Sequence, residues 1–280
     1  MIENINWYPG HMKKTRELIK DNLKLVDVVI EVVDARIPSA SRNPIIAELT
    51  ERKPRVVCLN KSDLSDPAAN KLWIDALTAE ETHPQAVLTD CRAGSGIKDL
   101  LKALAVEEKK KYPEDGPHKP LRMMIVGVPN VGKSSLINRL TGKRTAKVGD
   151  RPGVTRGKQW LTLTNGMQLM DTPGILWPKF EDPNVGLVLA FCGSIRDEIL
   201  DREGLALELI GVLARDYPEE LAARYKIEEL AETPLEVMEQ IAKKRGFLLG
   251  GGRFDYERTA NTVLDEFRSA TIGRITLERP

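Results

Sequence analysis

The stretch Gly127-Val-Pro-Asn-Val-Gly132-Lys133-Ser134 matches the pattern G-x-x-x-x-G-K-[ST]. It follows a short apolar run, Arg122–Val126, which predicts a strand, and it opens a predicted helix, Lys133–Leu140. Glycines let backbone N–H groups close around phosphate oxygens, and the N-terminus of the helix favours negative charge. Lys133 would then reach the β- and γ-phosphates, and Ser134 could ligate magnesium. The stretch predicts a phosphate-binding loop, with an ordinary glycine-rich turn as the alternative, and it does not choose between ATP and GTP.

Upstream of this loop, strands and helices alternate. A basic amphipathic helix is predicted over Met12–Leu25. Short apolar runs, typical of strands buried on both faces, occupy Val26–Val33, Arg55–Leu59 and Ala86–Leu88. Helical patterns lie between and after them, at Ile45–Leu49, Ala68–Leu77 and Ile97–Val106, before a Pro- and Gly-rich linker at Tyr112–Pro120. The alternation predicts a doubly wound α/β domain with a mostly parallel sheet.

Downstream of the loop the pattern changes. A hairpin is predicted from Trp160–Leu163 and Met167–Met170 around Asn165-Gly166. Beyond Pro178 no strand pattern remains, and helices are expected at Val185–Phe191, Asp197–Ala214, Pro218–Tyr225 and Pro234–Lys244. We therefore expect one α/β domain over residues 1–178 and a second, all-α domain over residues 179–280.

Composition excludes several classes of protein. The 280 residues carry 42 Lys and Arg against 41 Asp and Glu, so contact with nucleic acid would depend on local clusters of charge. Three scattered cysteines and three scattered histidines fit neither a disulfide framework nor a zinc site. The N-terminus lacks the apolar region of a signal peptide, and no apolar run approaches the length of a membrane span. We expect a cytoplasmic protein with no membrane contact.

Two further short motifs point to a guanine nucleotide. Asp171-Thr-Pro-Gly174 ends the second hairpin strand, where a carboxylate can hold magnesium and a glycine N–H can meet the γ-phosphate. Asn60-Lys61-Ser62-Asp63 follows a predicted strand, and its aspartate can accept hydrogen bonds from the ring N–H and the exocyclic amine of guanine. Each motif alone would be weak evidence, and Asp171–Gly174 alone would more often be a plain turn. Together with the phosphate loop they are specific.

At this point the chain resembles the translation-factor-related GTPases, but in a circularly permuted order, because Asn60–Asp63 precedes the phosphate loop. Asp90-Cys91-Arg92-Ala93-Gly94 stands where those proteins have a guanine-supporting loop. The segments Trp7–Met12, Val33–Pro38, Gly251–Tyr256 and Gly273–Leu277 look like the bacterial ribosome biogenesis GTPase A family, also called YlqF. The resemblance covers almost the whole chain. It implies a cytoplasmic, magnesium-dependent GTPase that assists late maturation of the large (50S) ribosomal subunit.

The resemblance also implies roles for individual residues. Those expected to bind GTP are Asn60, Lys61, Asp63, Cys91, Arg92, Asn130, Val131, Gly132, Lys133, Ser134, Ser135, Thr155 and Gly174. Those expected to hold Mg²⁺ are Ser134, Thr155 and Asp171, and those expected to act in catalysis are His11, Lys133, Thr155 and Gly174. Asn130 matches a residue that helps hold K⁺ in some relatives, and a solvated loop asparagine is the alternative.

The residue after Asp171–Gly174 is Ile175, which cannot orient the attacking water as a glutamine would. The resemblance nominates His11 instead. Near a helix N-terminus the positive end of the dipole should keep its ring neutral and able to accept a proton. A histidine that merely caps or packs is the alternative, as a loop threonine of no consequence is for Thr155.

Basic residues gather in two places. Between Arg139 and Lys158 there are seven basic residues and one acidic residue. The second cluster lies among aromatic side chains and comprises Lys243, Lys244, Arg245, Arg253 and Arg258 with Phe247, Phe254 and Tyr256. Such clusters suit phosphate contact and stacking on unpaired bases, although charged runs are often only solvated surface.

We therefore expect a monomeric GTPase whose partners are GTP and GDP, 23S rRNA and ribosomal proteins of the large-subunit precursor, and whose hydrolysis the particle stimulates. Three alternative functions remain. They are a permuted GTPase of the small subunit, a nucleotide-gated binding module that does not need hydrolysis, and an ATP-dependent small-molecule kinase.

Overall fold

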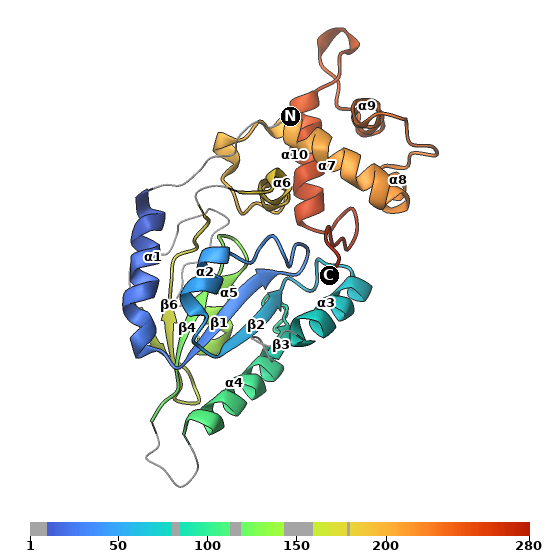
Figure 1. Ribbon diagram of the computed structural model, residues 1–280. Helices are drawn as coiled ribbons and strands as arrows, with labels where there is room; N and C mark the ends of the chain where they lie inside the picture. Colours follow the sequence, from blue (N-terminus) through green and yellow to red (C-terminus); the bar gives the residue numbers. More distant parts are fainter. Residues whose placement is uncertain (1–9, 80–84, 113–118, 143–158, 178–179) are drawn as a thin grey trace. The chain divides into compact units, whose positions relative to one another are not determined.

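The computed structural model describes residues 10–79, 85–112, 119–142, 159–177 and 180–280, and these form two compact units (Figure 1). The first unit contains the described residues up to Glu181 together with Thr276–Pro280. The second contains Asp182–Ile275. Among the described residues, no helix is both long enough and apolar enough to cross a membrane.

The first unit is built on a six-stranded sheet with the order β3-β2-β1-β4-β6-β5. The strands are β1 (Val28–Asp34), β2 (Arg55–Asn60), β3 (Gln85–Leu88), β4 (Arg122–Val126), β5 (Gln159–Thr162) and β6 (Gln168–Asp171). All neighbours pair in parallel except β5 and β6, which form the expected hairpin. Every residue of β1 is buried, as its nearly continuous apolar sequence predicts for a central parallel strand.

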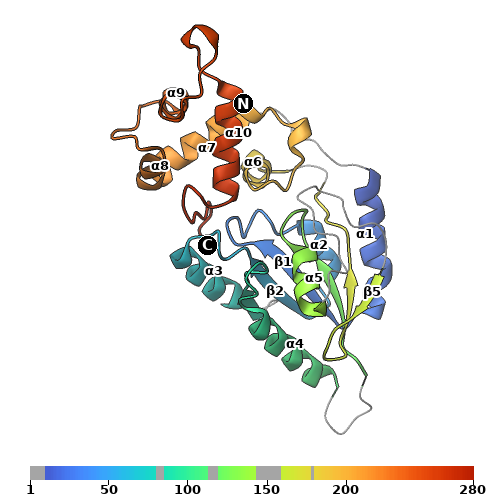
Figure 2. The same ribbon diagram turned by 180° about the vertical axis from the view of Figure 1, so that it is seen from behind.

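Helices cover both faces of this sheet, so the predicted doubly wound α/β fold is confirmed. They are α1 (Gly10–Asn22), followed by the short 3₁₀ turn η1 (Leu23–Leu25), α2 (Pro44–Thr50), α3 (Pro67–Ala79), α4 (Ile97–Lys111) and α5 (Lys133–Thr141). Figure 1 shows α1 and α2 in front of the sheet, and Figure 2 shows α5 on the opposite face. Trp73 and Leu77 of α3 pack with Leu59 of β2 in one apolar cluster.

The described elements of the second unit are all helical, as expected. They are α6 (Pro183–Phe191), η2 (Asp197–Ile199), α7 (Arg202–Asp216), α8 (Pro218–Tyr225), α9 (Pro234–Arg245), η3 (Gly250–Gly252) and α10 (Tyr256–Arg268). The single helix expected over Asp197–Ala214 is in fact divided. Asp201 caps α7 by accepting a hydrogen bond from the backbone N–H of Gly204 at 3.1 Å, so a new helix starts there.

Helix α10 lies outside the helices expected from the sequence, although its sequence is strongly amphipathic. Its buried residues recur with helical spacing at Thr259, Ala260, Val263, Leu264 and Phe267. It packs against α7 and α9 within the unit. Arg268 at its end donates to both carboxylate oxygens of Asp197 at 2.7 and 2.8 Å and so holds η2 in place.

The last five residues pack with the first unit instead of with the helices that precede them. The backbone N–H of Leu277 donates to the carbonyl of Arg36 at 2.8 Å. The side chain of Thr276 accepts from the backbone N–H of Asp66 at 3.0 Å. The division at residue 178 stays a prediction, and it gives no hint of these contacts.

Candidate nucleotide-binding site

The phosphate loop joins the end of β4 to the start of α5, as its sequence predicts. The ammonium group of Lys133 donates to the carbonyls of Gly127 at 3.0 Å and Val128 at 2.7 Å, so it lies inside the turn of the loop. Burial lowers the pKa of Lys133 to about 8, against the opposing charge of Asp171 and with a further lowering by Lys61. The loop therefore holds a buried cation where an anionic phosphate would gain most from it.

Two glycines allow the loop to pack closely against its neighbours. Gly132 has a φ of +98°, and a Cβ atom there would lie 2.1 Å from Nδ2 of Asn60. A Cβ atom on Gly174 would lie 2.8 Å from the Cα atom of Pro129 and 3.0 Å from Nζ of Lys133. Any side chain at either position would force the loop apart. Gly174 is thus placed against the phosphate loop, where the sequence expects it to meet the γ-phosphate.

Asn60, at the end of β2, connects the guanine motif to both neighbouring loops. Its amide Nδ2 donates to the carbonyl of Val131 at 2.7 Å. Its Oδ1 atom accepts from the hydroxyl of Thr89 at 3.1 Å and from the backbone N–H of Cys91 at 3.3 Å. The structure therefore brings together the three segments that sequence reasoning proposed for base and phosphate binding, although Val131 lies 71 positions beyond Asn60.

Lys61 is anchored by the buried carboxylate of Asp34, which lies in the family-like segment Val33–Pro38 but has no role assigned to it from the sequence. Its Nζ donates to Asp34 at 2.8 Å, and Lys61 itself has a φ of +63°. The guanidinium of Arg36 binds the same carboxylate through Nε at 2.9 Å and Nη2 at 2.7 Å. Burial alone would raise the pKa of Asp34, but the charges and hydrogen bonds of Arg36 and Lys61 lower it far below its usual value. Asp34 is thus an ionised anchor for the guanine motif.

Asp63, the expected reader of guanine, is half-buried at the end of the motif. Burial and the nearby negative charge of Asp90 raise its pKa, while a backbone hydrogen bond and the charge of Arg92 act in the opposite direction. Two N–H donors from a bound base would offset part of the free-energy cost of keeping this charged carboxylate half out of water.

The guanine-supporting loop is held from two sides. Oδ1 of Asp90 accepts from the backbone N–H groups of Arg92 at 2.7 Å and Ala93 at 3.1 Å, which forms a tight turn. Arg139 on α5 donates from Nε to the carbonyl of Cys91 at 2.8 Å and from Nη2 to that of Arg92. The sequence places Arg139 only in a basic cluster, because nothing in the local pattern indicates a contact across so many residues.

The Cys91 side chain is buried, and burial raises its pKa to about 12, so it is a neutral thiol. A nucleotide would meet this loop through backbone groups and not through a thiolate. A cysteine at position 91 is therefore compatible with the role expected of this loop.

The segment that begins at Asp171 is also fixed against the phosphate loop. Asp171 is buried at the end of β6, and the hydroxyl of Thr172 donates to the carbonyl of Ile125 at 2.6 Å. The backbone N–H of Ile175 donates to the carbonyl of Gly127 at 3.3 Å, and its carbonyl accepts from Nδ2 of Asn43 at 2.8 Å. The Ile175 side chain is fully buried, so it neither reaches nor orients a water molecule at the site.

The remaining expected site residues fall into two groups. Ser134, Ser135 and Asn130 are half-buried, Val131 is buried, and Asn130 has a φ of +59°. His11 belongs by its backbone to the first turn of α1, but its side chain lies outside the described residues, as does all of Thr155. Six of the seven basic residues between Arg139 and Lys158 also lie outside them.

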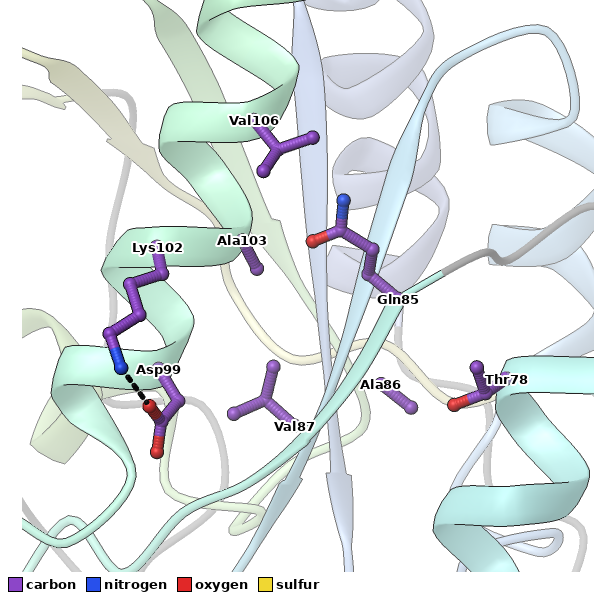
Figure 3. A pocket seen from close by; sticks show the side chains of 8 residues that line it. All are labelled: Thr78, Gln85, Ala86, Val87, Asp99, Lys102, Ala103 and Val106. Atoms are coloured by element: carbon purple, nitrogen blue, oxygen red, sulfur yellow. Dashed lines mark hydrogen bonds and ion pairs between the residues drawn. The ribbon is translucent and has the colours of Figure 1, made fainter.

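A separate surface pocket of about 390 Å³ lies between α3, β3 and α4 (Figure 3). Its lining comprises Thr78, Gln85, Ala86, Val87, Asp99, Lys102, Ala103 and Val106. Its charged residues, Lys102 and Asp99, form an exposed ion pair at 2.9 Å. It contains none of the expected site residues.

Two family profiles match the chain. One, described as RsgA GTPase, matches residues 11–181, and the other, described as 50S ribosome-binding GTPase, matches residues 122–242.

Individual relatives match over nearly the full length. The chain is 47% identical over 281 residues to ribosome biogenesis GTPase A of Priestia megaterium, covering 99% of this chain and 97% of that protein. It is 35% identical to mitochondrial ribosome-associated GTPase 1 of Bos taurus, covering 98% of this chain and 88% of that protein. The crystal structure of GNP-bound YlqF from T. maritima superposes with a TM-score of 0.70 at 31% identity, covering 95% of this chain and 98% of that one.

Proposed function

The chain belongs to the ribosome biogenesis GTPase A family, and on that premise we propose that it is a GTP-hydrolysing assembly factor that binds rRNA and assists late maturation of the large ribosomal subunit. The substrates are GTP and water, and the products are GDP and phosphate. The observation that carries the proposal is the network of Asn60, which holds the base-reading motif, its supporting loop and the phosphate loop in one arrangement.

Base selection rests on the side chain of Asp63. Guanine presents a ring N–H and an exocyclic amine on one edge, and a carboxylate accepts from both. Adenine lacks this pair of donors, so a half-buried carboxylate facing it would lose its solvation without gaining hydrogen bonds. A small-molecule kinase that uses ATP is disfavoured on this ground.

Bound phosphate groups would replace the two backbone carbonyls as hydrogen-bond acceptors of the Lys133 ammonium group. In the structure its ammonium is held by two backbone carbonyls, and a γ-phosphate oxygen is a stronger, charged acceptor. Close packing of Gly174 against Pro129 lets its backbone N–H approach the same phosphate. The negative charge that develops on the transferred group is then met by a lysine, by loop N–H groups and by the N-terminus of α5.

Magnesium fits the oxygen ligands offered by this chain. Asp171, which is buried at the end of β6 and whose charge acts on Lys133, and Ser134 at the start of α5 both supply the hard oxygen atoms that Mg²⁺ prefers. Thr155 would complete the set from the switch segment when GTP is present. When bound, the cation neutralises charge on the β- and γ-phosphates. Asn130 would hold K⁺ as a further cofactor.

We assign to His11 the role of orienting the attacking water and accepting its proton. Ile175 occupies the position of the water-orienting glutamine of other GTPases and is buried in the protein. A neutral histidine in the first turn of α1 is a suitable acceptor for a proton of the water. Because hydrolysis needs both His11 and Thr155 in place at the nucleotide, their positioning by a ribosomal particle would raise a slow basal rate.

The helical unit would provide the rRNA contact. Lys243, Lys244, Arg253 and Arg258 are exposed, Phe247, Phe254 and Tyr256 are half-buried, and the guanidinium of Arg258 lies 4.4 Å from the ring centre of Phe247. Exposed cations beside aromatic rings suit phosphates and unpaired bases. Arg245, by contrast, donates to Glu266 at 3.0 Å and stacks on Tyr225, which gives it a structural role.

We place the protein in the cytoplasm as a monomer.

The deciding experiment measures turnover of GTP and of ATP by the purified chain, alone and with purified large-subunit precursors or small subunits. We expect slow basal GTP hydrolysis, strong stimulation by large-subunit particles alone, and no turnover of ATP. Equal use of ATP, or equal stimulation by small subunits, would contradict the proposal. GTP-dependent particle binding with no stimulated turnover would favour the alternative of a nucleotide-gated binding module.

A further inference from the structure

The C-terminal segment Thr276–Pro280 is bonded to the loop that follows β1. The backbone N–H of Leu277 donates to the carbonyl of Arg36 at 2.8 Å. The carboxylate of Glu278 accepts from the backbone N–H groups of Ser39 at 2.6 Å and Ala40 at 3.0 Å. Glu278 is half-buried, and burial raises its pKa to about 7, although the two N–H groups act in the opposite direction.

The same segment is bonded to the chain that follows the guanine motif. The Thr276 hydroxyl accepts from the backbone N–H of Asp66, three residues beyond Asp63. The Asp66 carboxylate in turn accepts from Nη2 of Arg279 at 3.1 Å. The indole N–H of Trp73, on α3, donates to the carbonyl of Glu278 at 3.1 Å. The segment therefore ties together two loops that are far apart in sequence.

The first of these loops meets the guanine motif itself at one buried ionic group. Arg36 is 1% exposed and binds both oxygens of Asp34, which is 0% exposed. The Asp34 carboxylate also holds the ammonium of Lys61, the second residue of the guanine motif. Lys61 takes up a left-handed backbone conformation, which sets the direction in which the chain continues to Asp63. A non-glycine residue keeps such a conformation only where its surroundings hold it there.

We propose that Thr276–Pro280 is a positioning element of the guanine site. It fixes the loop after β1 that contains Arg36, Ser39 and Ala40 (the Arg36 loop) and, through Asp34 and Lys61, the placement of Asp63. The proposal rests on the proposed function as a guanine-nucleotide enzyme. Release of the segment removes the acceptors of the Ser39, Ala40 and Asp66 N–H groups and opens the Arg36 loop to water. The Asp34 carboxylate then has water and counter-ions as competing partners, and its hold on Lys61 weakens.

Such a role has a signature that general damage to the fold does not have. The hydrogen bonds described above for Thr276–Pro280 go to the Arg36 loop, to Asp66 and to Trp73, and none of them goes to the phosphate loop. ADP, which would bind through its phosphates alone, should therefore keep its weak affinity when the segment is removed. GDP, which also uses Asp63, should lose affinity.

The test compares the full chain with a chain that ends at Ile275, by calorimetric titration with GDP and with ADP and by thermal unfolding. We expect the Kd for GDP to rise about tenfold and the Kd for ADP to stay within about twofold. Glu278→Ala should reproduce a roughly threefold or greater part of the effect, and Glu278→Gln, which keeps an acceptor oxygen, should restore GDP binding. Removal of Pro280 alone and Glu232→Ala, an exposed acidic residue of the helical unit, are the controls.

An unchanged ratio of the two affinities in the shortened chain would overturn the proposal, whether both are kept or both fall together with the melting temperature. These results differ from failure of the proposed function. If the full-length chain itself bound GDP and ADP equally, this would contradict the proposed guanine specificity and therefore the proposed function. If it selected GDP and the shortened chain did so equally well, only the role of Thr276–Pro280 would fall.

Discussion

The side-chain amide of Asn60 donates to the backbone carbonyl of Val131 at 2.7 Å, which links the guanine motif directly to the phosphate loop. Asn60→Ala would leave this carbonyl and the Cys91 N–H without a buried partner. We expect the free energy of unfolding to fall by about 1–3 kcal/mol and the Kd for GDP to rise. Denaturant unfolding and GDP titration test this, with Thr78→Ala on the exposed side of α3 as the control. An Asn60→Ala variant with unchanged stability and affinity would show that the bridge is energetically neutral.

Asp63 should determine which base is accepted. Asp63→Asn replaces an acceptor by an amide, which suits xanthine better than guanine because xanthine has a carbonyl in place of the exocyclic amine. We expect GTP affinity to fall on the order of a hundredfold or more and xanthosine triphosphate to become a substrate. Competition binding and turnover with both nucleotides measure this, and Asp75→Asn on α3 is the control. Full GTP affinity in Asp63→Asn would mean that the guanine motif is misassigned.

Nucleotide affinity should depend on the protonation of Lys133. Its pKa is lowered to about 8 by burial, and bound phosphates would raise it again, so binding takes up a proton where the free lysine is partly neutral. Affinity is therefore full below about pH 7 and falls as the pH rises through 8, by about sevenfold between about pH 7 and pH 8.8. GDP titrations in buffers of different ionisation enthalpy measure both the Kd and the proton uptake. A constant Kd with no proton uptake over this interval would contradict the prediction.

His11 should act on the water and not on nucleotide binding. His11→Ala is expected to lower particle-stimulated turnover on the order of a hundredfold, the scale of a lost orienting or general-base group. The Kd for GTP and the melting temperature should barely change, because the side chain would act only in the transition state. A packing role would instead lower the melting temperature and weaken binding along with turnover. Full stimulated activity in the variant would remove His11 from the mechanism.

Binding to ribosomal particles should be electrostatic and should depend on the helical unit. Reversal of charge at Lys243 and Lys244 is expected to weaken particle binding and to make its salt dependence shallower, by a slope of about 0.7 to 0.9 for each phosphate that is no longer neutralised. Basal GTP hydrolysis should stay unchanged. The control reverses Lys71 and Lys98, two exposed lysines on α3 and α4. A silent reversal, or binding that is insensitive to salt, would place the RNA contact elsewhere.

Arg245 is left out of this variant for a structural reason. It donates to Glu266 and stacks on Tyr225, so its reversal would bury two like charges together. The sequence shows a run of three basic residues from Lys243 to Arg245 and cannot tell which of them turns inward.

The fold and the nucleotide motifs could be predicted because each depends on neighbouring residues. The buried strand β1 is a nearly continuous apolar run, and the phosphate loop is a turn whose glycines and lysine lie within eight residues. Helix α10 carries a local signal of the same kind in the spacing of Thr259, Val263 and Phe267, although the sequence prediction omitted it. Its polar residues outnumber its apolar ones, so only the periodicity distinguishes it from a solvated segment.

The contacts that complete the site could not be predicted, because they join residues far apart in sequence. Arg139 reaches the carbonyl of Cys91 across 48 positions, and Glu278 reaches the N–H of Ser39 across 239. An arginine on a helix or a glutamate near a chain end has no local pattern that distinguishes it from an ordinary solvated charge. Only the folded chain shows that these two charges are bonded to loops of the candidate site.

The permuted order of the sheet has a consequence for how the protein is synthesised. Strand β1 lies between β2 and β4, and Val28 pairs with Met123, so one partner of β1 leaves the ribosome long after β1 itself. Until then the edge of β1 that will face β4 presents unpaired backbone N–H and C=O groups between largely apolar side chains, and such an edge is a template for pairing with other chains. Parallel pairing between such distant segments is also slow. We therefore expect the emerging chain to need shielding by a chaperone until β4 pairs with β1. Once the segments before and after β4 are joined in one sheet, a bound nucleotide that contacts both should stabilise the folded state against their separation.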